Sequence, residues 1–192
     1  MKKTIFAAVA LVGLSMASLS AQAISITGGI SFAGDATPAP AGNWGGATGV
    51  NFGDTEFNAR VSSVSGSYAG VPAGAITGQL ATFFDFTFAP ALNPNPVLLW
   101  TFDFGGRTYS FLMDTVSVAG QSTNFLDLTG YGTLSITGYD DARGVWRFTG
   151  QQAGNPATFS FSSSNEPLPE PSTLALLGLG LLGISAARRR KI

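Results

Sequence analysis

Short runs in which apolar and polar residues alternate make up most of the chain between residues 24 and 165. Alternation with a period of two is typical of a strand that buries one face, and glycine, proline, asparagine and aspartate separate the runs, as turn residues do. Few stretches keep the period of an amphipathic helix. The pattern therefore predicts an all-β domain of about eight to ten strands.

The clearest predicted hairpin joins residues 133–137 to residues 145–149 across a turn that contains Asp140, Asp141 and Gly144. Alternate side chains of a strand point to opposite faces, so one set from this hairpin should face the core. A closing strand is expected over residues 158–162. The residues predicted to face the core are Leu134, Ile136, Trp146, Phe148, Phe159 and Phe161.

Earlier segments continue the same alternation and begin near residue 26. Their predicted core residues are Ile26, Ile30, Phe32, Phe84, Phe86, Phe88, Leu98, Trp100, Phe102, Phe104, Tyr109, Phe111, Met113, Val116 and Val118. Strands at spacings of roughly ten to fifteen residues favour a two-sheet arrangement over an open sheet. We therefore expect a single antiparallel β-sandwich or jelly-roll-like domain.

Charge narrows the range of partners. The 142 residues from 24 to 165 suffice for one domain with its own core. They carry four arginines against nine carboxylates, a net charge of −5. Nucleic-acid binding depends on basic groups that neutralise phosphates. No nucleic-acid partner is therefore expected.

The chain has neither histidine nor cysteine, and its only lysines lie near the two ends. These absences exclude Ser-His-Asp triads, imidazole and thiolate metal sites, disulfides and thiol nucleophiles. Schiff-base and Ser-Lys chemistry in the body is excluded as well. We expect no cofactor, assign no metal ligand and assign no catalytic residue.

Carboxylates are the remaining groups able to carry catalysis, as paired acids do in glycoside hydrolysis. Their alternation with core aromatics points them outward, which favours solvated surface acids. Asp140 and Asp141 could offer oxygen ligands to Ca²⁺, but they lack the spacing of a calcium loop, and a plain hairpin turn is favoured. The strand-borne candidates for catalysis are Asp85, Asp103, Asp114 and Asp127.

Exposed aromatic rings are a second kind of candidate, because flat apolar faces stack on sugar rings without any charge. Four aromatics lie near glycine-rich loops, where packing beneath the loops is favoured over ligand contact. They are Trp44, Tyr68, Tyr131 and Tyr139, whereas Trp100 and Trp146 fit core positions.

The N-terminus has the pattern of a signal peptide. Lys2 and Lys3 precede an apolar stretch over residues 5–19, and Ala21 and Ala23 are small residues at the positions that a signal peptidase reads. We expect a signal peptide over residues 1–23, cleaved after Ala23, and export by the Sec route. An uncleaved N-terminal anchor is the alternative.

The C-terminus combines three features in order. Pro169, Glu170 and Pro171 precede an apolar run over residues 173–187, and the basic residues Arg188, Arg189, Arg190 and Lys191 follow it. A helix over residues 172–187 would rise roughly 24 Å, so it spans a hydrocarbon core of ~30 Å only with thinning or snorkelling. A buried core helix is the alternative, although such a helix would normally be amphipathic.

The four basic residues favour the cytoplasmic side, which leaves the Pro-Glu-Pro triplet and the body across the membrane. Residues 162–168 are polar and rich in serine, and are predicted to form a linker between the body and this tail. The expected organisation is a signal peptide over 1–23, a β-sandwich passenger over 24–161, the linker over 162–168 and a sorting segment with a transmembrane helix over 169–192.

Together the two ends resemble the PEP-CTERM family of exported bacterial proteins. The resemblance rests on the Pro-Glu-Pro triplet, the helix "STLALLGLGLLGISAA", the basic "RRRK" and the N-terminal signal; "GTLSITGYDDARGVWRFTGQ" also looks like the terminal hairpin common in such passengers. It implies that an exosortase recognises Pro169, Glu170 and Pro171 and cuts nearby. It further implies a Gram-negative host that makes exopolysaccharide, biofilm or flocs.

We therefore expect an exported cell-surface or extracellular-matrix protein without catalytic activity, associated with exopolysaccharide. Its processing partners are signal peptidase and exosortase, and its contact with the inner membrane is transient. The first alternative is a carbohydrate-binding module, which needs exposed tryptophan or tyrosine. A carboxylate-dependent glycosidase needs two facing acids in a cleft, and self-assembly through sheet edges is the third alternative.

Overall fold

The computed structural model describes residues 24–53, 58–151 and 157–165, without the side chains of 157–163 and 165. The predicted signal peptide and sorting segment lie outside these residues. The elements are β1 (Gly29–Ala39), η1 (Trp44–Gly46), β2 (Gly49–Asn51), β3 (Ala59–Val64), η2 (Gly66–Tyr68), β4 (Leu80–Phe83), β5 (Phe86–Thr87), β6 (Val97–Phe104), β7 (Arg107–Met113), β8 (Ser117–Ser122), β9 (Phe125–Ile136), β10 (Ala142–Gln151) and β11 (Ala157–Asn165), where η denotes a 3₁₀ helix.

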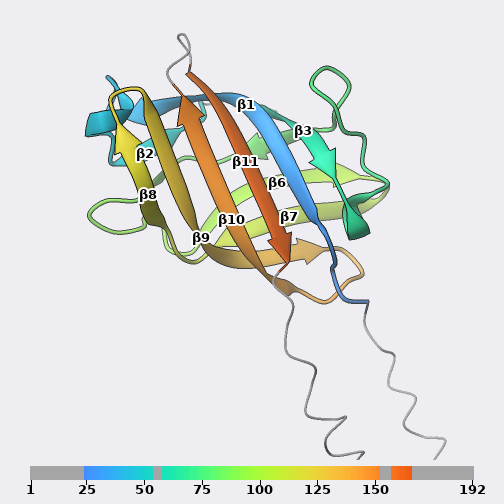
Figure 1. The fold of residues 1–192 in the computed structure, drawn as a ribbon. Coiled ribbons are helices and arrows are strands. Elements are labelled where there is room, and N and C mark those ends of the chain that lie inside the picture. The colour runs from blue at the N-terminus through green and yellow to red at the C-terminus, as the bar shows by residue number, and fades with distance from the viewer. Residues whose placement is uncertain (1–23, 54–57, 152–156, 166–192) are drawn as a thin grey trace, which may run out of the picture.

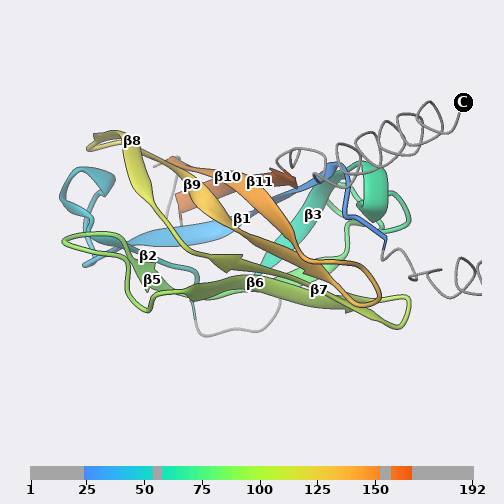
Figure 2. The ribbon, with the colours of Figure 1, turned by 90° about the horizontal axis from the view of Figure 1, so that it is seen from below.

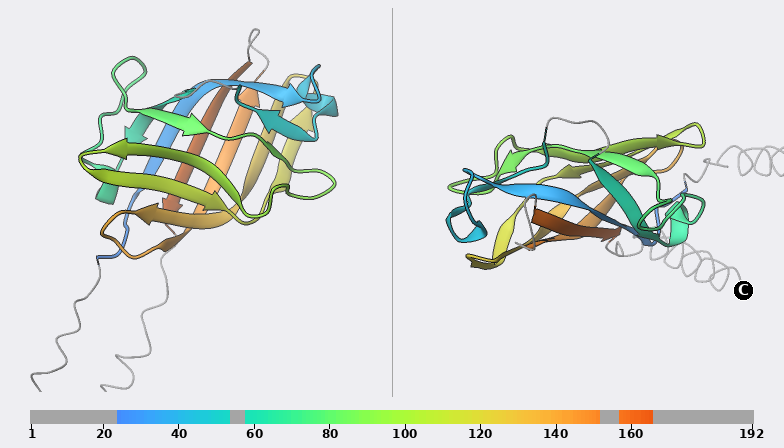
Figure 3. Two further views of the ribbon diagram at one scale, coloured as in Figure 1. Left: turned by 180° about the vertical axis from the view of Figure 1, so that it is seen from behind. Right: turned by 90° about the horizontal axis from the view of Figure 1, so that it is seen from above.

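The strands confirm the predicted all-β antiparallel class. One layer contains β8, β9, β10, β11, β1 and β3 (Figure 1), and β6 and β7 cross behind it (Figures 2 and 3). The two layers pack face to face, as in a β-sandwich, but they belong to one continuous sheet. This sheet closes on itself, because β11 pairs with both β10 and β1.

Strand β9 carries the sheet from one layer to the other. Its first half pairs with β8 and its second half with β7. Gly130 lies between the two halves and Gly132 begins the second, and a Cβ would meet the carbonyl oxygen of Thr115 at 2.0 Å from Gly130 and that of Leu112 at 2.4 Å from Gly132. The absence of a side chain at these two positions therefore permits the close crossing.

Aromatic rings fill the space between the layers. The ring of Phe32 lies 4.9 Å from that of Trp100 and 5.1 Å from that of Phe83, measured between centroids. Most of the predicted core is confirmed as buried. The confirmed residues are Ile26, Ile30, Phe32, Phe86, Phe88, Trp100, Phe102, Tyr109, Phe111, Met113, Leu134, Ile136, Trp146 and Phe148.

Three predicted core residues are wrong: Phe84, Leu98 and Val118 are 39%, 41% and 47% exposed. An irregularity in the β6–β7 register between Leu98 and Trp100 shifts the alternation, so that Leu99 becomes buried beside Trp100. Phe83 takes the inner position that was predicted for Phe84, because β4 ends there. Val118 lies on β8, whose single partner among the described strands is β9.

Two further predicted core residues, Phe104 and Val116, are only partly buried against the core. The side chains of Phe159 and Phe161 lie outside the described ones.

The predicted hairpin is confirmed as the β9–β10 pair, with shifted boundaries. Gly144 belongs to β10 and pairs with Gly132, so it is not part of the turn. A Cβ at Gly144 would meet Leu134 Cδ1 at 2.9 Å, which explains glycine inside a strand here. The last described strand, β11, runs to Asn165 and therefore includes the first four residues of the segment predicted as a linker over 162–168.

Gly66 is a position where any side chain should be costly. Its φ is +59°, and a Cβ there would lie 2.3 Å from the carbonyl oxygen of Thr27. Gly105, in the β6–β7 turn, has the same φ of +59° but nothing within 4 Å of a Cβ. Gly105→Ala should lose about 1 kcal/mol from backbone strain alone, and Gly66→Ala at least about 3 kcal/mol. Urea unfolding of both variants measures the difference, and equal losses would refute the steric explanation.

Tyr68 should make stability sensitive to alkaline pH. Its side chain is fully buried, and its hydroxyl has no hydrogen-bond partner among the described residues. Burial, with a smaller contribution from Tyr109, raises the pKa of Tyr68 above its usual range. With the folded pKa raised, stability does not depend on this titration well below the unfolded pKa of about 10, and it falls as the pH rises above that value, because only the unfolded state then ionises readily.

The variant Tyr68→Phe removes both the titration and an unpaired buried hydroxyl. At pH 7 it should be more stable than the wild type by about 1 kcal/mol. Above pH of about 10, its melting temperature should fall less steeply. Calorimetry across that range tests both points, and parallel pH profiles for the two proteins would contradict them.

Candidate functional site

The described chain begins and ends at the same end of the closed sheet. β1 and β11 are antiparallel neighbours, and Gly29 at the start of β1 pairs with Ser164 near the end of β11. Three residues separate Asn165 from Pro169 in the sequence. A fully extended chain covers at most about 14 Å over that interval. The sequence therefore leaves only a short connection between β11 and the triplet Pro169-Glu170-Pro171.

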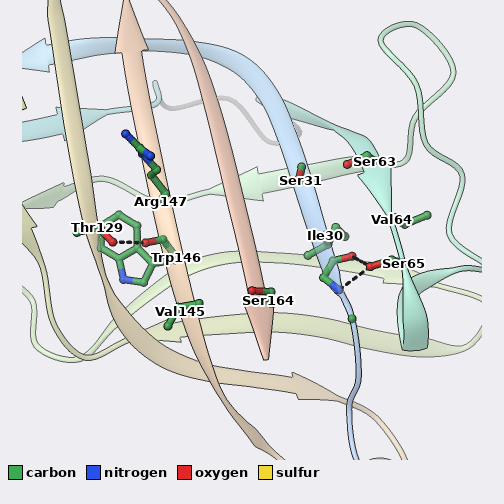
Figure 4. Close-up of a pocket in the computed structure, with 12 residues that line it drawn as sticks. Ile30, Ser31, Ser63, Val64, Ser65, Thr129, Val145, Trp146, Arg147 and Ser164 are labelled. Atoms are coloured by element: carbon green, nitrogen blue, oxygen red, sulfur yellow. Dashed lines mark hydrogen bonds between the residues drawn. The ribbon is translucent and has the colours of Figure 1, made fainter. Parts of the chain in front are cut away.

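A cavity of about 530 Å³ opens on the outer surface of the layer that contains β9, β10, β11, β1 and β3 (Figure 4). We call it the hydroxyl groove. Its polar lining comes from Thr129 and Arg147 on one side, Ser63 and Ser65 on the other, and Ser31 and Ser164 between them. It therefore spans five neighbouring strands.

One strand of the groove, β1, carries small residues on its outer face. Gly29, Ser31 and Ala33 alternate with the buried Ile30 and Phe32 along β1. Longer side chains stand on β10, where Val145 also lines the groove and the side chain of Arg147 is 64% exposed. Strand β11 lies between β1 and β10, so the short outward residues of β1 and the longer ones of β10 flank the groove on either side of it.

Two of the hydroxyls hold backbone groups in the groove walls. The Oγ of Ser65 accepts a hydrogen bond from the amide of Gly29 at 3.0 Å and donates to its carbonyl at 3.4 Å. The Oγ1 of Thr129 donates to the carbonyl of Trp146 at 2.9 Å (Figure 4). Within the described part of the chain, the hydroxyls of Ser31, Ser63 and Ser164 make no side-chain hydrogen bond.

An ion pair stands beside the groove. Arg147 donates from Nε to Asp127 Oδ1 at 2.9 Å and from Nη2 to Oδ2 at 2.5 Å. The hydrogen bond, and then the charge of the carboxylate, raise the pKa of Arg147. The two charges compensate each other at this wall. The groove therefore presents polar groups without a strong net charge.

Tyr131 extends this surface along β9. It is two residues beyond Thr129 and pairs in register with Val145. Its side chain is 40% exposed, and the guanidinium carbon of Arg143 lies 4.7 Å from its ring centroid. Residues two apart on a strand share a face, so Tyr131 adjoins the groove on the same outer surface.

Three of the four predicted catalytic acids have separate side-chain partners. Asp127 binds Arg147, Asp103 accepts from the hydroxyl of Thr108 at 2.6 Å, and Asp85 accepts from the amide of Phe52 at 2.7 Å. Asp114 is half-buried, and its backbone amide donates to the carbonyl of Tyr131 at 3.0 Å. These contacts fit structural or surface roles.

The acids of the β9–β10 turn do not build a calcium site in the described residues. Asp141 accepts from the hydroxyl of Ser135 at 2.6 Å, and the amide of Asp140 donates to the carbonyl of Ile24 at 3.0 Å. No group of three or more acidic residues in residues 24–53, 58–151 and 157–165 could hold a metal ion. The hairpin turn that the sequence favoured is what the structure shows.

The four loop aromatics divide into two groups. Trp44 and Tyr68 are fully buried, so they pack beneath the loops as favoured. Tyr139 is half-buried, with the guanidinium carbon of Arg107 5.2 Å from its ring centroid. Tyr131 alone among the four is markedly exposed. Trp100 and Trp146 occupy the core as predicted.

Sequence reasoning missed the groove residues themselves. The available signal was the serine and threonine content at outward positions of the first and last strands, such as Ser31 and Ser164. These hydroxyls form one site only because β1 and β11 pair side by side, and the sequence does not reveal that pairing.

The sorting residues lie outside the described residues. They are Ala21, Ala23, Pro169, Glu170, Pro171, Arg188, Arg189, Arg190 and Lys191. In the part of the chain that the structure describes, no helix combines the length and the apolar character needed to span a membrane.

Comparison with known proteins identifies the C-terminal segment. Residues 167–191 match the family model of the PEP-CTERM protein-sorting motif. No curated protein and no solved structure matches the chain. The resemblance drawn from the sequence is thereby confirmed for this segment: the chain carries a PEP-CTERM protein-sorting motif over residues 167–191. The motif marks it as an exported substrate of an exosortase, with a membrane-anchored sorting signal before processing.

Proposed function

We propose that this chain is a cell-surface or extracellular-matrix protein without catalytic activity, associated with exopolysaccharide. The observation that carries the proposal is the sorting motif at residues 167–191. The motif occupies only the C-terminal tail, so the activity of the body must be argued from its own surface.

The proposed route has two cuts. Signal peptidase removes residues 1–23 during Sec export in a Gram-negative cell, and the tail holds the protein briefly in the inner membrane. Exosortase then cuts near Pro169-Glu170-Pro171 and frees the body for the cell surface or the medium. The described domain supports this order, because its last strand ends at Asn165, before the motif begins.

The contacts of the strand-borne aspartates support the absence of catalytic activity. A glycosidase of the paired-carboxylate type needs two facing carboxylates, one of which donates a proton. Asp85, Asp103 and Asp127 instead bind a backbone amide, a threonine hydroxyl and an arginine. The hydroxyl groove favours carbohydrate binding as the second candidate function, since serine and threonine hydroxyls line it beside apolar residues such as Val64 and Val145.

Deletion of the exosortase gene from the producing cells tests the proposed route. The expected result is a precursor that stays in the membrane fraction, keeps its C-terminal tail and disappears from the medium. Restoring the gene should restore the shorter form. An unaltered amount of extracellular protein in the deletion strain would overturn the proposal.

A further inference from the structure

We propose that the hydroxyl groove binds an uncharged polysaccharide, with Tyr131 as a stacking platform beside it. The choice of a polysaccharide rests on the proposed location at the cell surface. The position of the site and the charge of its ligand rest on the residues of the outer sheet face.

The groove and the platform form one surface. Val145 lines the groove and pairs in register with Tyr131 across the β9–β10 ladder. Residues two apart on a strand lie about 7 Å from each other, so Tyr131 stands that far from Thr129. A chain of sugars lying across β10 could thus contact the ring of Tyr131 and the hydroxyls of the groove together.

The groove has the hydrogen-bonding capacity that sugar hydroxyls require. Each serine hydroxyl both donates and accepts, and Ser31, Ser63 and Ser164 are not engaged by other described side chains. Asp127 binds two of the five N–H groups of Arg147, whose side chain is 64% exposed. Donors and acceptors are therefore available from Arg147 on β10 to Ser63 on β3.

Charge selects an uncharged polymer over an acidic one. Asp127 compensates Arg147 at the groove wall, so that arginine offers no unpaired charge to an anion. The body as a whole carries a net charge of −5 between residues 24 and 165. Repulsion at long range opposes uronic-acid polymers and phosphates.

The lining also argues against a protein partner. Interfaces between proteins depend on large apolar or aromatic anchors that become buried. The exposed large hydrophobic residues include Phe84, Leu98 and Leu112, but no described residue that lines the groove. A hydroxyl-rich trough with one aromatic at its end suits a hydrated polymer better.

The test is affinity electrophoresis of the full chain in a detergent that has no sugar headgroup. Native gels contain dextran, hydroxyethylcellulose, galactomannan or, as the acidic polymer, alginate. At least one of the three uncharged polymers should retard the protein. Tyr131→Ala should weaken that retardation about fivefold to tenfold. Ser31→Leu, which fills the trough, should weaken it as well.

Leu98→Ala is the matched control, because Leu98 is 41% exposed on β6 and is not part of the groove lining. It should bind like the wild type, and circular dichroism should show all variants folded. Failure of all three uncharged polymers to retard the wild type would overturn the proposal. So would equal retardation of the wild type and the folded Tyr131→Ala and Ser31→Leu variants, or stronger retardation by alginate.

This test is independent of processing, because it uses the chain with both ends intact. Loss of binding with normal release would reject the groove and leave the sorting proposal standing. Binding in a chain that is never released would support the groove and reject the sorting proposal.

Discussion

Replacing Pro169, Glu170 and Pro171 together with alanine is expected to trap the protein in the membrane as a precursor with its tail intact. These residues lie near the start of the sorting motif matched at residues 167–191. Because proline disfavours helix at its own position and at the residue before it, we expect the triplet to stay extended and accessible for cleavage. Alanine favours helix and would remove that signal. Most of the extracellular protein should disappear.

Cell fractionation followed by immunoblotting measures the effect. Glu166→Ala is the matched control, because Glu166 lies one residue before the matched segment. That variant should be released like the wild type. Unchanged release of the triple-alanine variant would show that the triplet does not direct processing.

Removing β11 is expected to abolish the fold. This strand has eight register pairs with β1 and eight with β10, and it closes the sheet between them. Its loss would expose two long strand edges and open the core. The lost pairing and packing should exceed the stability of an ordinary domain, about 5–15 kcal/mol.

Two truncated proteins separate the strand from the tail. A chain of residues 24–165 should melt cooperatively, because it keeps every described strand. A chain of residues 24–151 should show no cooperative transition by circular dichroism or calorimetry. Similar melting temperatures for the two proteins would contradict a closing role for β11.

The position of β11 also links folding to export in the proposed route. The sheet cannot close until the chain has crossed the membrane as far as Asn165, because β11 is its last strand. The sorting motif follows at once in the sequence. Closure of the domain and presentation of the motif are therefore late and adjacent events.

The alternation of residues predicted the strands and most of the core, because one buried face gives a period of two. It failed where the backbone breaks that period. The irregularity between Leu98 and Trp100 reverses the faces of β6, and the end of β4 turns Phe84 outward. Such local irregularities depend on how neighbouring strands fit together, so a single sequence does not reveal them.

The two candidate sites differ in how far the sequence could predict them. The sorting motif is contiguous, so its order of Pro169-Glu170-Pro171, apolar run and basic tail could be read directly. The hydroxyl groove joins residues from opposite ends of the chain, such as Ser31 and Ser164. It exists because β1 and β11 pair, and that long-range pairing required the structure.

The most direct test of the central claim is the intact mass of the protein in the membrane, surface and medium fractions of the producing cells. We predict an extracellular form that begins at Ile24 and lacks the basic residues Arg188, Arg189, Arg190 and Lys191. A protein that keeps this tail and stays entirely in the inner membrane would contradict exosortase processing and the surface role built on it.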